Sequence, residues 1–253
     1  MALQVGTCKL CLQNKPLISQ SHIIPEFMYE FLFDKHHKMY MVDPKKYIEG
    51  DKTFQRPPSG EYEGGILCAK CDNETIGQYE TYGERVLFAG VNKSVSDPIC
   101  QHGRTETGIP LTRCTNVDYT KFKLFLLSIL WRASISKREF FRDVALGPYE
   151  EQVRQMILGG DPKETEVFPV IMISWLFDSS MSPEFVAQPG INRATTGIRY
   201  VFPIGGTTYV FHVSPESFDK RLLPFTILPT NVITFFHMPE GKGWDMFRRY
   251  YNI

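Results

Sequence analysis

The chain has 253 residues, of which 43% are hydrophobic and 22% are charged. This is enough to bury one large core or two modest ones, which excludes a short peptide that needs external support. The 28 Lys and Arg residues balance the 28 Asp and Glu residues, which excludes a strong overall field drawing the protein onto phosphate backbones or anionic membranes. Any contact with nucleic acid is therefore expected to be local.

The first residues contain no long apolar run between a basic start and a small-residue cleavage site, so no secretory signal is expected. The longest apolar cluster, Leu124 to Trp131, is far shorter than the ~20 residues needed to span a bilayer. These features predict a cytoplasmic, soluble protein with no membrane partner.

Two pairs of cysteines with the same spacing stand near the beginning, Cys8 with Cys11 and Cys68 with Cys71. A Cys-x2-Cys turn lets two thiolates reach one tetrahedral ion at about 2.3 Å, so two pairs complete a four-thiolate site. Because thiols stay reduced in the cytoplasm, the pattern favours metal over disulfides. We expect one structural Zn2+ with a closed coordination shell, which stabilises the fold and does no chemistry.

The stretch between the pairs contains Ser21-His22-Ile23-Ile24-Pro25 and then a polar segment with Asp34, His36 and His37. The polar segment is typical of a solvated loop. The second cysteine pair is followed by Asp72-Asn73-Glu74, which are favourable at the start of a helix. Apolar residues then recur at helical spacing, which predicts a helix opening near Cys71; they are Ile76, Tyr79, Tyr82 and Val86.

The residues from 96 to 116 contain several glycines and prolines and little periodicity, which is typical of a linker or surface excursion. Cys100, His102 and Cys114 fall in this stretch. As a second metal site they lack a fourth ligand, and buried free cysteines are the alternative.

The remaining elements follow in order. Helical spacing predicts a buried core helix around Phe122 to Ala133, and a second helix runs from Pro148 to the glycine stop at Gly159-Gly160. Strands are expected over 167–177, over 197–203 paired with 207–213, and over 231–237, and a short helix over 244–251. Within these elements we expect Arg132 to extend its charged end to solvent or to meet a buried acid. We expect His212 and His237 to be core or sheet residues whose polar atoms are hydrogen-bonded.

The predicted fold class is α+β: a treble-clef, ββα-metal-like zinc module, then a helical segment and a mostly antiparallel sheet. We place the zinc module with its long insert at residues 1–115. Residues 116–253 form an α+β domain whose role is open, whether substrate, partner or regulatory.

The ordered set of Cys8/Cys11, Ser21-His22-Ile23-Ile24-Pro25 and Leu67-Cys68-Ala69-Lys70-Cys71 resembles the HNH family, the zinc-supported treble-clef branch of the His-Me finger nucleases. The resemblance covers residues 8 to about 85. It implies that His22 is a general base for the water that attacks a phosphodiester, and that a catalytic Mg2+ or Mn2+ lies beside it. It also implies a nucleic-acid substrate, with DNA preferred over RNA, and such families suggest bacterial defence against foreign DNA, alone or in a protein complex.

Two positions depart from the family pattern. Ser21 stands where an acidic or histidine ligand is usual, and Asp72 stands where histidine is usual. Asp72 is a competent ligand for a hard divalent ion, whereas Ser21 is a poor one. Asn73 is the candidate for the family's asparagine, and Glu74 or the polar loop can supply a further ligand. The alternative is a catalytically inactive zinc module that binds nucleic acid or a protein partner, in which His22 only packs or caps.

Overall fold

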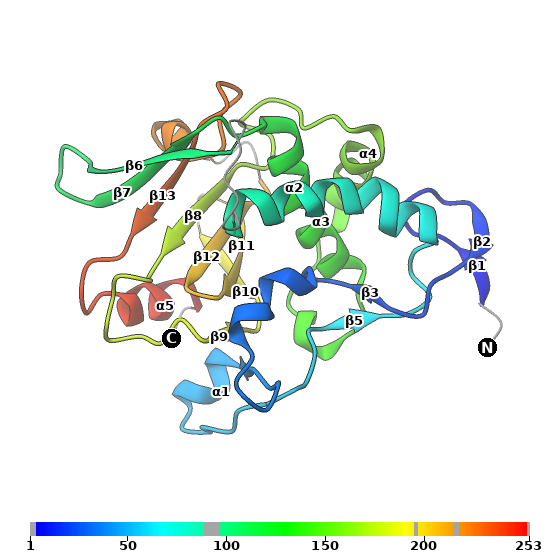
Figure 1. Cartoon of the computed structure of the whole chain (residues 1–253), viewed down its shortest axis with the longest axis horizontal. Coiled ribbons are helices and arrows are strands. Elements are labelled where there is room, and N and C mark those ends of the chain that lie inside the picture. Colours follow the sequence, from blue (N-terminus) through cyan, green and yellow to red (C-terminus); the bar gives the residue numbers. More distant parts are fainter. Residues whose placement is uncertain (1–3, 89–96, 195–196, 215–217, 252–253) are drawn as a thin grey trace.

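The computed structural model describes residues 4–88, 97–194, 197–214 and 218–251 (Figure 1). Within them, nine strands form one large sheet. Most neighbouring strands are antiparallel, and the parallel pairs are β13 with β8 and β4 with β9. Across the sheet the order is β4 (Tyr40–Val42), β9 (Phe185–Ala187), β11 (Gly197–Ile204), β12 (Thr207–His212), β8 (Val170–Ser174), β13 (Ile233–His237), β7 (Pro110–Thr115) and β6 (Ile99–Arg104), and β10 (Gly190–Ala194) also pairs with β11.

The hairpin expected between residues 197 and 213 is present as β11 and β12, with Ile204 opposite Thr207. Its two-residue turn is Gly205-Gly206, with φ values of 53° and 81°. Positive φ at both turn positions matches the right-handed twist of the flanking strands, and glycine adopts it without steric cost. The strand expected over 167–177 is the shorter β8, and the strand expected over 231–237 is β13.

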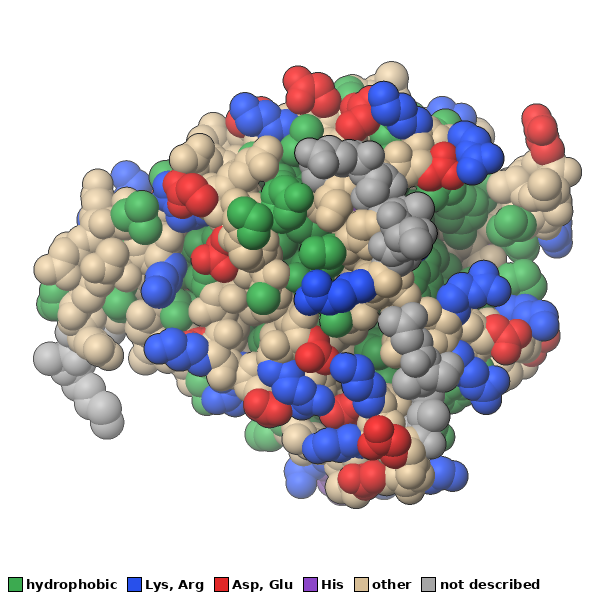
Figure 2. Space-filling model, turned by 180° about the vertical axis from the view of Figure 1, so that it is seen from behind, with side chains coloured by type: hydrophobic (Ala, Val, Ile, Leu, Met, Phe, Trp, Pro, Cys, Tyr) green, Lys and Arg blue, Asp and Glu red, His purple; other side chains and the backbone are tan. Residues whose placement is uncertain are grey.

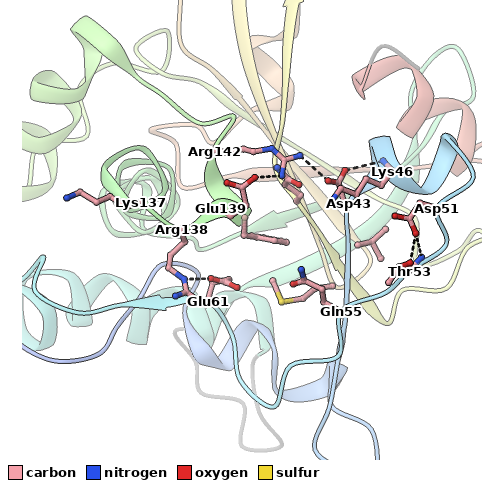
Figure 3. A pocket seen from close by; sticks show the side chains of 14 residues that line it. Asp43, Lys46, Asp51, Thr53, Gln55, Glu61, Lys137, Arg138, Glu139 and Arg142 are labelled. Carbon is pink, nitrogen blue, oxygen red and sulfur yellow. Dashed lines mark hydrogen bonds and ion pairs between the residues drawn. The ribbon is translucent and has the colours of Figure 1, made fainter.

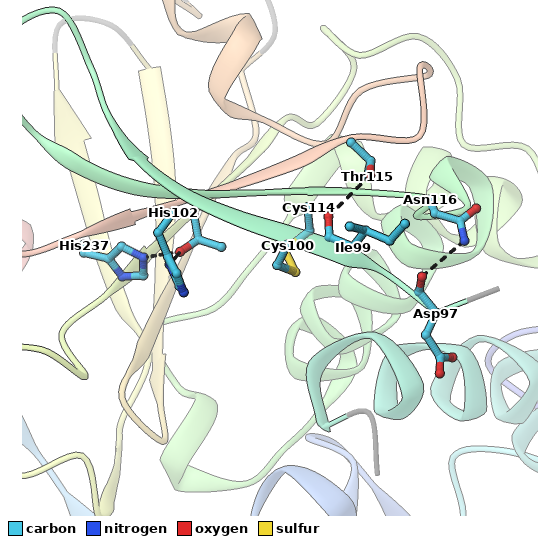
Figure 4. The surroundings of a disulfide bond; sticks show 9 residues. Asp97, Ile99, Cys100, His102, Cys114, Thr115, Asn116 and His237 are labelled. Carbon is cyan, nitrogen blue, oxygen red and sulfur yellow. Dashed lines mark hydrogen bonds between the residues drawn. A yellow bond between two sulfur atoms is a disulfide. The ribbon is translucent and has the colours of Figure 1, made fainter. Parts of the chain in front are cut away.

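Of the two interpretations of residues 96–116, a linker or a surface excursion, the linker is wrong for the described part, residues 97–116, whereas the exposed β6 agrees with a surface position. Strands β6 and β7 form a hairpin there, and β7 joins the main sheet through β13. The glycine-rich composition belongs to the hairpin tip, where Gly108 has a φ of 84°. Cys100 and Cys114 are opposite each other in this hairpin and form a disulfide (Figure 4). Both earlier interpretations of these cysteines, free thiols and a second metal site, are therefore wrong.

The three longest helices pack in a layer beside the sheet (Figure 1). They are α2 (Gly77–Phe88), α3 (Tyr119–Ile135) and α4 (Glu150–Gly159), with α1 (Pro44–Ile48) and α5 (Gly243–Tyr251) lying apart from them. The buried helix, the glycine-stopped helix and the short last helix are thus confirmed as α3, α4 and α5. Helix α4 ends where Gly160 adopts φ 68°, and α3 buries its polar Lys123, Ser128 and Arg132 with its apolar side chains. Short 3-10 helices are η1 (Glu26–Met28), η2 (Glu30–Leu32), η4 (Glu139–Phe141), η5 (Gly147–Tyr149) and η7 (Lys220–Phe225).

The cysteine-rich part contains two small sheets, β1 (Val5–Thr7) with β2 (Asn14–Pro16) and β3 (Ser21–His22) with β5 (Tyr62–Glu63). The expected helix after Cys68 begins as a π-helical segment, η3 (Lys70–Ile76), and continues as α2. One hydrophobic cluster of buried residues runs from Cys8 through α3 to Ile233.

The mixed α+β class with a large, mostly antiparallel sheet is confirmed. Strands from both sides of residue 115 share this sheet, and the division at that residue stays a prediction. None of the helices in the described part of the chain has the length and apolar character needed to cross a membrane. Disulfides are usual in oxidising compartments, so Cys100–Cys114 does not favour the cytoplasm, and that location also stays a prediction.

Candidate functional site

The four cysteines of the two Cys-x2-Cys pairs converge on one point. Their Sγ atoms all lie within 4.8 Å of one another, so they can hold a metal ion such as zinc. The first pair sits in the turn between β1 and β2, where the backbone of Leu12 has φ 59° and its N–H donates to the Cys8 carbonyl. The backbone N–H of Cys68 donates to Cys8 Sγ at 3.4 Å, which joins the two halves of the cluster.

The electrostatics of the cluster also fit a bound cation. Burial raises the pKa of the Cys71 thiol, and the neighbouring sulfurs of Cys68, Cys11 and Cys8 raise it further. Four thiolates therefore repel one another here, and a divalent cation is what lets all four deprotonate together. The Arg154 guanidinium, on α4, donates to the Leu10 carbonyl within the first turn and fixes that turn against the helical layer.

A cavity of about 360 Å³ lies beside this module, between β3 and the helical segment formed by η3 and α2. Ser21 is buried, and its Oγ donates a hydrogen bond of 2.6 Å to Asp72 Oδ1, which joins β3 to η3. The side chains of His22, Asp72 and Asn73 line the cavity, so these three sequence candidates lie around one space. The His22 ring meets Tyr62 edge to face, with ring centroids 6.1 Å apart.

Arg132 forms the floor of this cavity and is 1% exposed. One guanidinium nitrogen donates to the His22 carbonyl at 2.6 Å, and another forms an ion pair of 2.6 Å with Glu80. The expectation that Arg132 meets an acid is confirmed. Because the guanidinium is planar and rigid, it fixes the His22 strand relative to helix α2.

Carboxylates outnumber cations around the cavity, whose acidic residues are Glu26, Asp72, Glu80 and Glu84. Burial raises the pKa of Asp72; the Ser21 hydrogen bond and the charge of Arg132 oppose this rise, and the charge of Glu80 adds to it. Such a cavity attracts a cation and repels phosphate. Within the described residues no carboxylate or histidine group converges as the cysteines do, so a divalent ion here would complete its shell with water and substrate oxygens.

The other sequence candidates lie elsewhere. Glu74, Asp34, His36 and His37 do not line the cavity. Asp34 accepts from the backbone N–H groups of His36 and Lys38 and pairs with Arg56. These contacts agree with the interpretation of that segment as a polar loop.

The sequence analysis missed three acidic cavity residues: Glu26, which follows the Pro25 of the histidine motif, and Glu80 and Glu84 on α2. The spacing of four residues puts Glu80 and Glu84 on one face of α2, and Asp72 precedes Glu80 by about two helical turns. Following the helical period of the acidic residues, as well as that of the apolar ones, would have found these two.

A larger cavity of about 510 Å³ lies between α1 and the segment after α3 (Figure 3). Its two arginines are already paired, Arg138 with Glu61 and Arg142 with Asp43 and Glu139, and its lysines Lys46 and Lys137 share the lining with acidic residues. Lys and Arg side chains are mixed with Asp and Glu on the face seen in Figure 2. Neither feature provides the basic groove that tracks a nucleic-acid backbone.

Comparisons with protein-family models, with curated proteins and with solved structures found no match. Function is therefore inferred from the chemistry of the site itself.

Proposed function

We propose that the protein is a metal-dependent endonuclease that hydrolyses phosphodiester bonds in the cavity between β3 and helix η3. The observation that carries this proposal is the convergence of His22, Asp72 and Asn73 on one cavity next to the four-cysteine cluster, with the buried Ser21 joining β3 to Asp72 by a hydrogen bond. A zinc ion in that cluster joins the knuckle to the start of the helix. It thereby supports the facing arrangement that the HNH resemblance implies.

The reaction follows from these groups. His22 accepts a proton from a water molecule as the water oxygen attacks phosphorus. Asp72 would hold Mg2+ or Mn2+ in the cavity that Glu80 and Glu84 also line, and the ion would supply charge stabilisation to the phosphorane and the leaving oxygen. The acidic lining explains why the ion is required: without it, the carboxylates repel the scissile phosphate.

Cleavage assays test the catalytic assignment. Purified protein is incubated with DNA and with RNA in Mg2+ or Mn2+, and product strands are measured over time. We expect metal-dependent cleavage, with DNA preferred, and a loss of about 100-fold or more in rate for His22→Ala, since a general base contributes on that order. Asp72→Asn should lose a similar factor, and part of that loss should return at higher Mn2+.

The matched control is His36→Ala, because His36 is exposed and does not line the cavity. It should cleave as the wild type does. Absence of cleavage in the wild type, or a His22→Ala rate equal to that of the wild type, contradicts the catalytic assignment.

A specific observation favours a second candidate, a catalytically inactive zinc module that binds nucleic acid or a protein partner. The ligands for a catalytic ion are partly satisfied already, since Asp72 accepts from Ser21 and Glu80 pairs with Arg132. This candidate predicts binding without turnover, and no uptake of Mn2+ beyond the four-cysteine cluster. Equilibrium dialysis with Mn2+ distinguishes the two, because only the nuclease binds a second ion that Asp72→Asn removes.

The biological setting follows from analogy alone. Nucleases of this kind serve in bacterial defence, and a protein partner that delivers the substrate would compensate for the balanced charge of this chain. Co-expression with neighbouring genes followed by size-exclusion chromatography tests for such a partner.

A further inference from the structure

Residues of β4, α1, β9 and α5, none of which lines the cavity beside His22, form an open pocket of about 340 Å³. This volume lies at the lower end of the ~300–1,000 Å³ range of small-molecule pockets. Helix α1 and strand β9 lie near α5 in the lower left part of Figure 1. The side chains that line the pocket are mainly aromatic, and among the described residues none that lines it is basic.

The aromatic side chains that line the pocket contact one another in a continuous series. Successive members of this series have ring centroids 5.8 to 6.1 Å apart. Its first and last members, Tyr40 and Phe185, are opposite each other in the register of β4 with β9. We call these six residues the aromatic cluster; in order they are Tyr40, Phe54, Tyr47, Trp244, Phe247 and Phe185.

Hydrogen bonds fix the helices that carry the aromatic cluster, so the pocket is formed before a ligand binds. Asp43 accepts from the backbone N–H groups of Lys45 and Lys46 and caps α1, which carries Tyr47. Asp178 accepts from the backbone N–H of Gly243 at the start of α5, and Trp244 Nε1 donates to the Ser180 carbonyl. A pocket with fixed walls avoids the entropy cost of ordering them on binding.

The charge of the lining selects the ligand. Among the described residues that line the pocket, the charged one is Glu184, whose side chain is exposed; its backbone N–H donates to Ser182 Oγ. Aromatic faces present negative charge to the space they enclose, so they attract a cation. Nearby, the Arg56 guanidinium lies 4.8 Å from the centroid of the Tyr40 ring, which is an internal example of the same attraction.

We propose that the aromatic cluster and Glu184 form a binding site for a small quaternary ammonium group. The aromatic side chains that line the pocket contact the methyl groups, and the Glu184 carboxylate balances the charge. Anionic ligands are disfavoured because Glu184 has no basic residue beside it in the cavity wall. This site is independent of the nuclease proposal.

Isothermal titration of the wild-type protein at constant ionic strength tests the proposal. Choline and tetramethylammonium are compared with 3,3-dimethyl-1-butanol, in which a carbon replaces the charged nitrogen. We expect saturable binding of both cations and binding of the neutral alcohol that is about tenfold weaker or less, the contribution expected of a cation in an aromatic cage. A peptide carrying trimethyllysine, titrated in parallel, shows whether a protein side chain or a free molecule binds better.

Two variants with the same change of charge complete the test. Glu184→Gln should weaken choline binding by about tenfold, whereas Glu106→Gln, in the exposed tip between β6 and β7, should leave it unchanged. Equal affinity for choline and its neutral analogue overturns the proposal, and so does binding of adenosine without binding of either cation. The comparison of ligands uses the wild-type chain, so it decides the question even where a variant folds poorly.

Discussion

His212 shows how one buried side chain makes the stability of the fold depend on pH. It lies on β12 with 6% of its surface exposed, and its ring meets Phe218 edge to face. Burial, and after it the positive charge of Arg199, lower the pKa of His212 from 6.5 to about 4. As the pH falls from 6.5 to 4, the unfolded chain takes up a proton that the folded chain does not, so the free energy of unfolding falls.

Replacing His212 by phenylalanine removes this titration and keeps a ring in the core. We expect the free energy of unfolding of the wild type to fall relative to that of His212→Phe by up to about 3 kcal/mol between pH 6.5 and pH 4. Above pH 7 the difference between the two proteins should stay constant. Urea unfolding at a series of pH values measures it, and a difference that does not change with pH contradicts the assignment.

Arg132 illustrates what can be predicted about a single residue from sequence. Its place in the most apolar segment predicts that its charge needs a partner, and Glu80 meets it. The identity of the partner, and the contact with the His22 carbonyl, depend on how α2, α3 and β3 pack together. Sequence periodicity describes each of these elements separately and contains no information on their relative positions.

At the scale of elements, the packing of α2 on α3 depends on a glycine. A Cβ atom on Gly83 would lie 2.6 Å from ring atoms of Phe125, which is fully buried. We expect Gly83→Ala to lower the free energy of unfolding by about 1–3 kcal/mol through overpacking, which outweighs the gain of up to ~1 kcal/mol in helix propensity.

The matched control is Gly159→Ala at the end of α4, where a Cβ would meet nothing within 4 Å. That variant should be neutral or slightly more stable in the same thermal or urea unfolding experiment. If both variants unfold alike, the close approach of α2 to α3 does not limit the packing.

The helices and the hairpin of β11 and β12 follow from local patterns, because periodicity and turn glycines act over a few residues. The hairpin of β6 and β7 was missed for the opposite reason. Its glycines and prolines resemble those of a linker, and what makes it part of the sheet is its pairing with β13, which begins at Ile233, far along the chain. The pairing of β4 with β9 could not be predicted either, because these two strands are far apart in the sequence.

For the molecule as a whole, we expect one Zn2+ per chain, held by the four cysteines. Cys68→Ser should lose the metal and lower the midpoint of thermal unfolding, because binding of a structural zinc contributes several kcal/mol to folding. The double variant Cys100→Ala with Cys114→Ala removes the same kind of residue outside the cluster and should keep one zinc. Elemental analysis and thermal unfolding measure both effects. A Cys68→Ser protein that still contains one zinc excludes the cluster as the site.

Strand β13 lies between β8 and β7 in the sheet but comes late in the chain, so the sheet cannot be completed until most of the protein has been synthesised. Once residue 71 has left the ribosome, all four cysteines of the cluster are available, so the zinc module can close early. The hairpin of β6 and β7 has been made long before β13, its link to the rest of the sheet, and until β13 emerges the inner edge of β7 stays unpaired. An unpaired edge is where chains associate wrongly, so slow translation between residues 115 and 233 should favour aggregation of nascent chains.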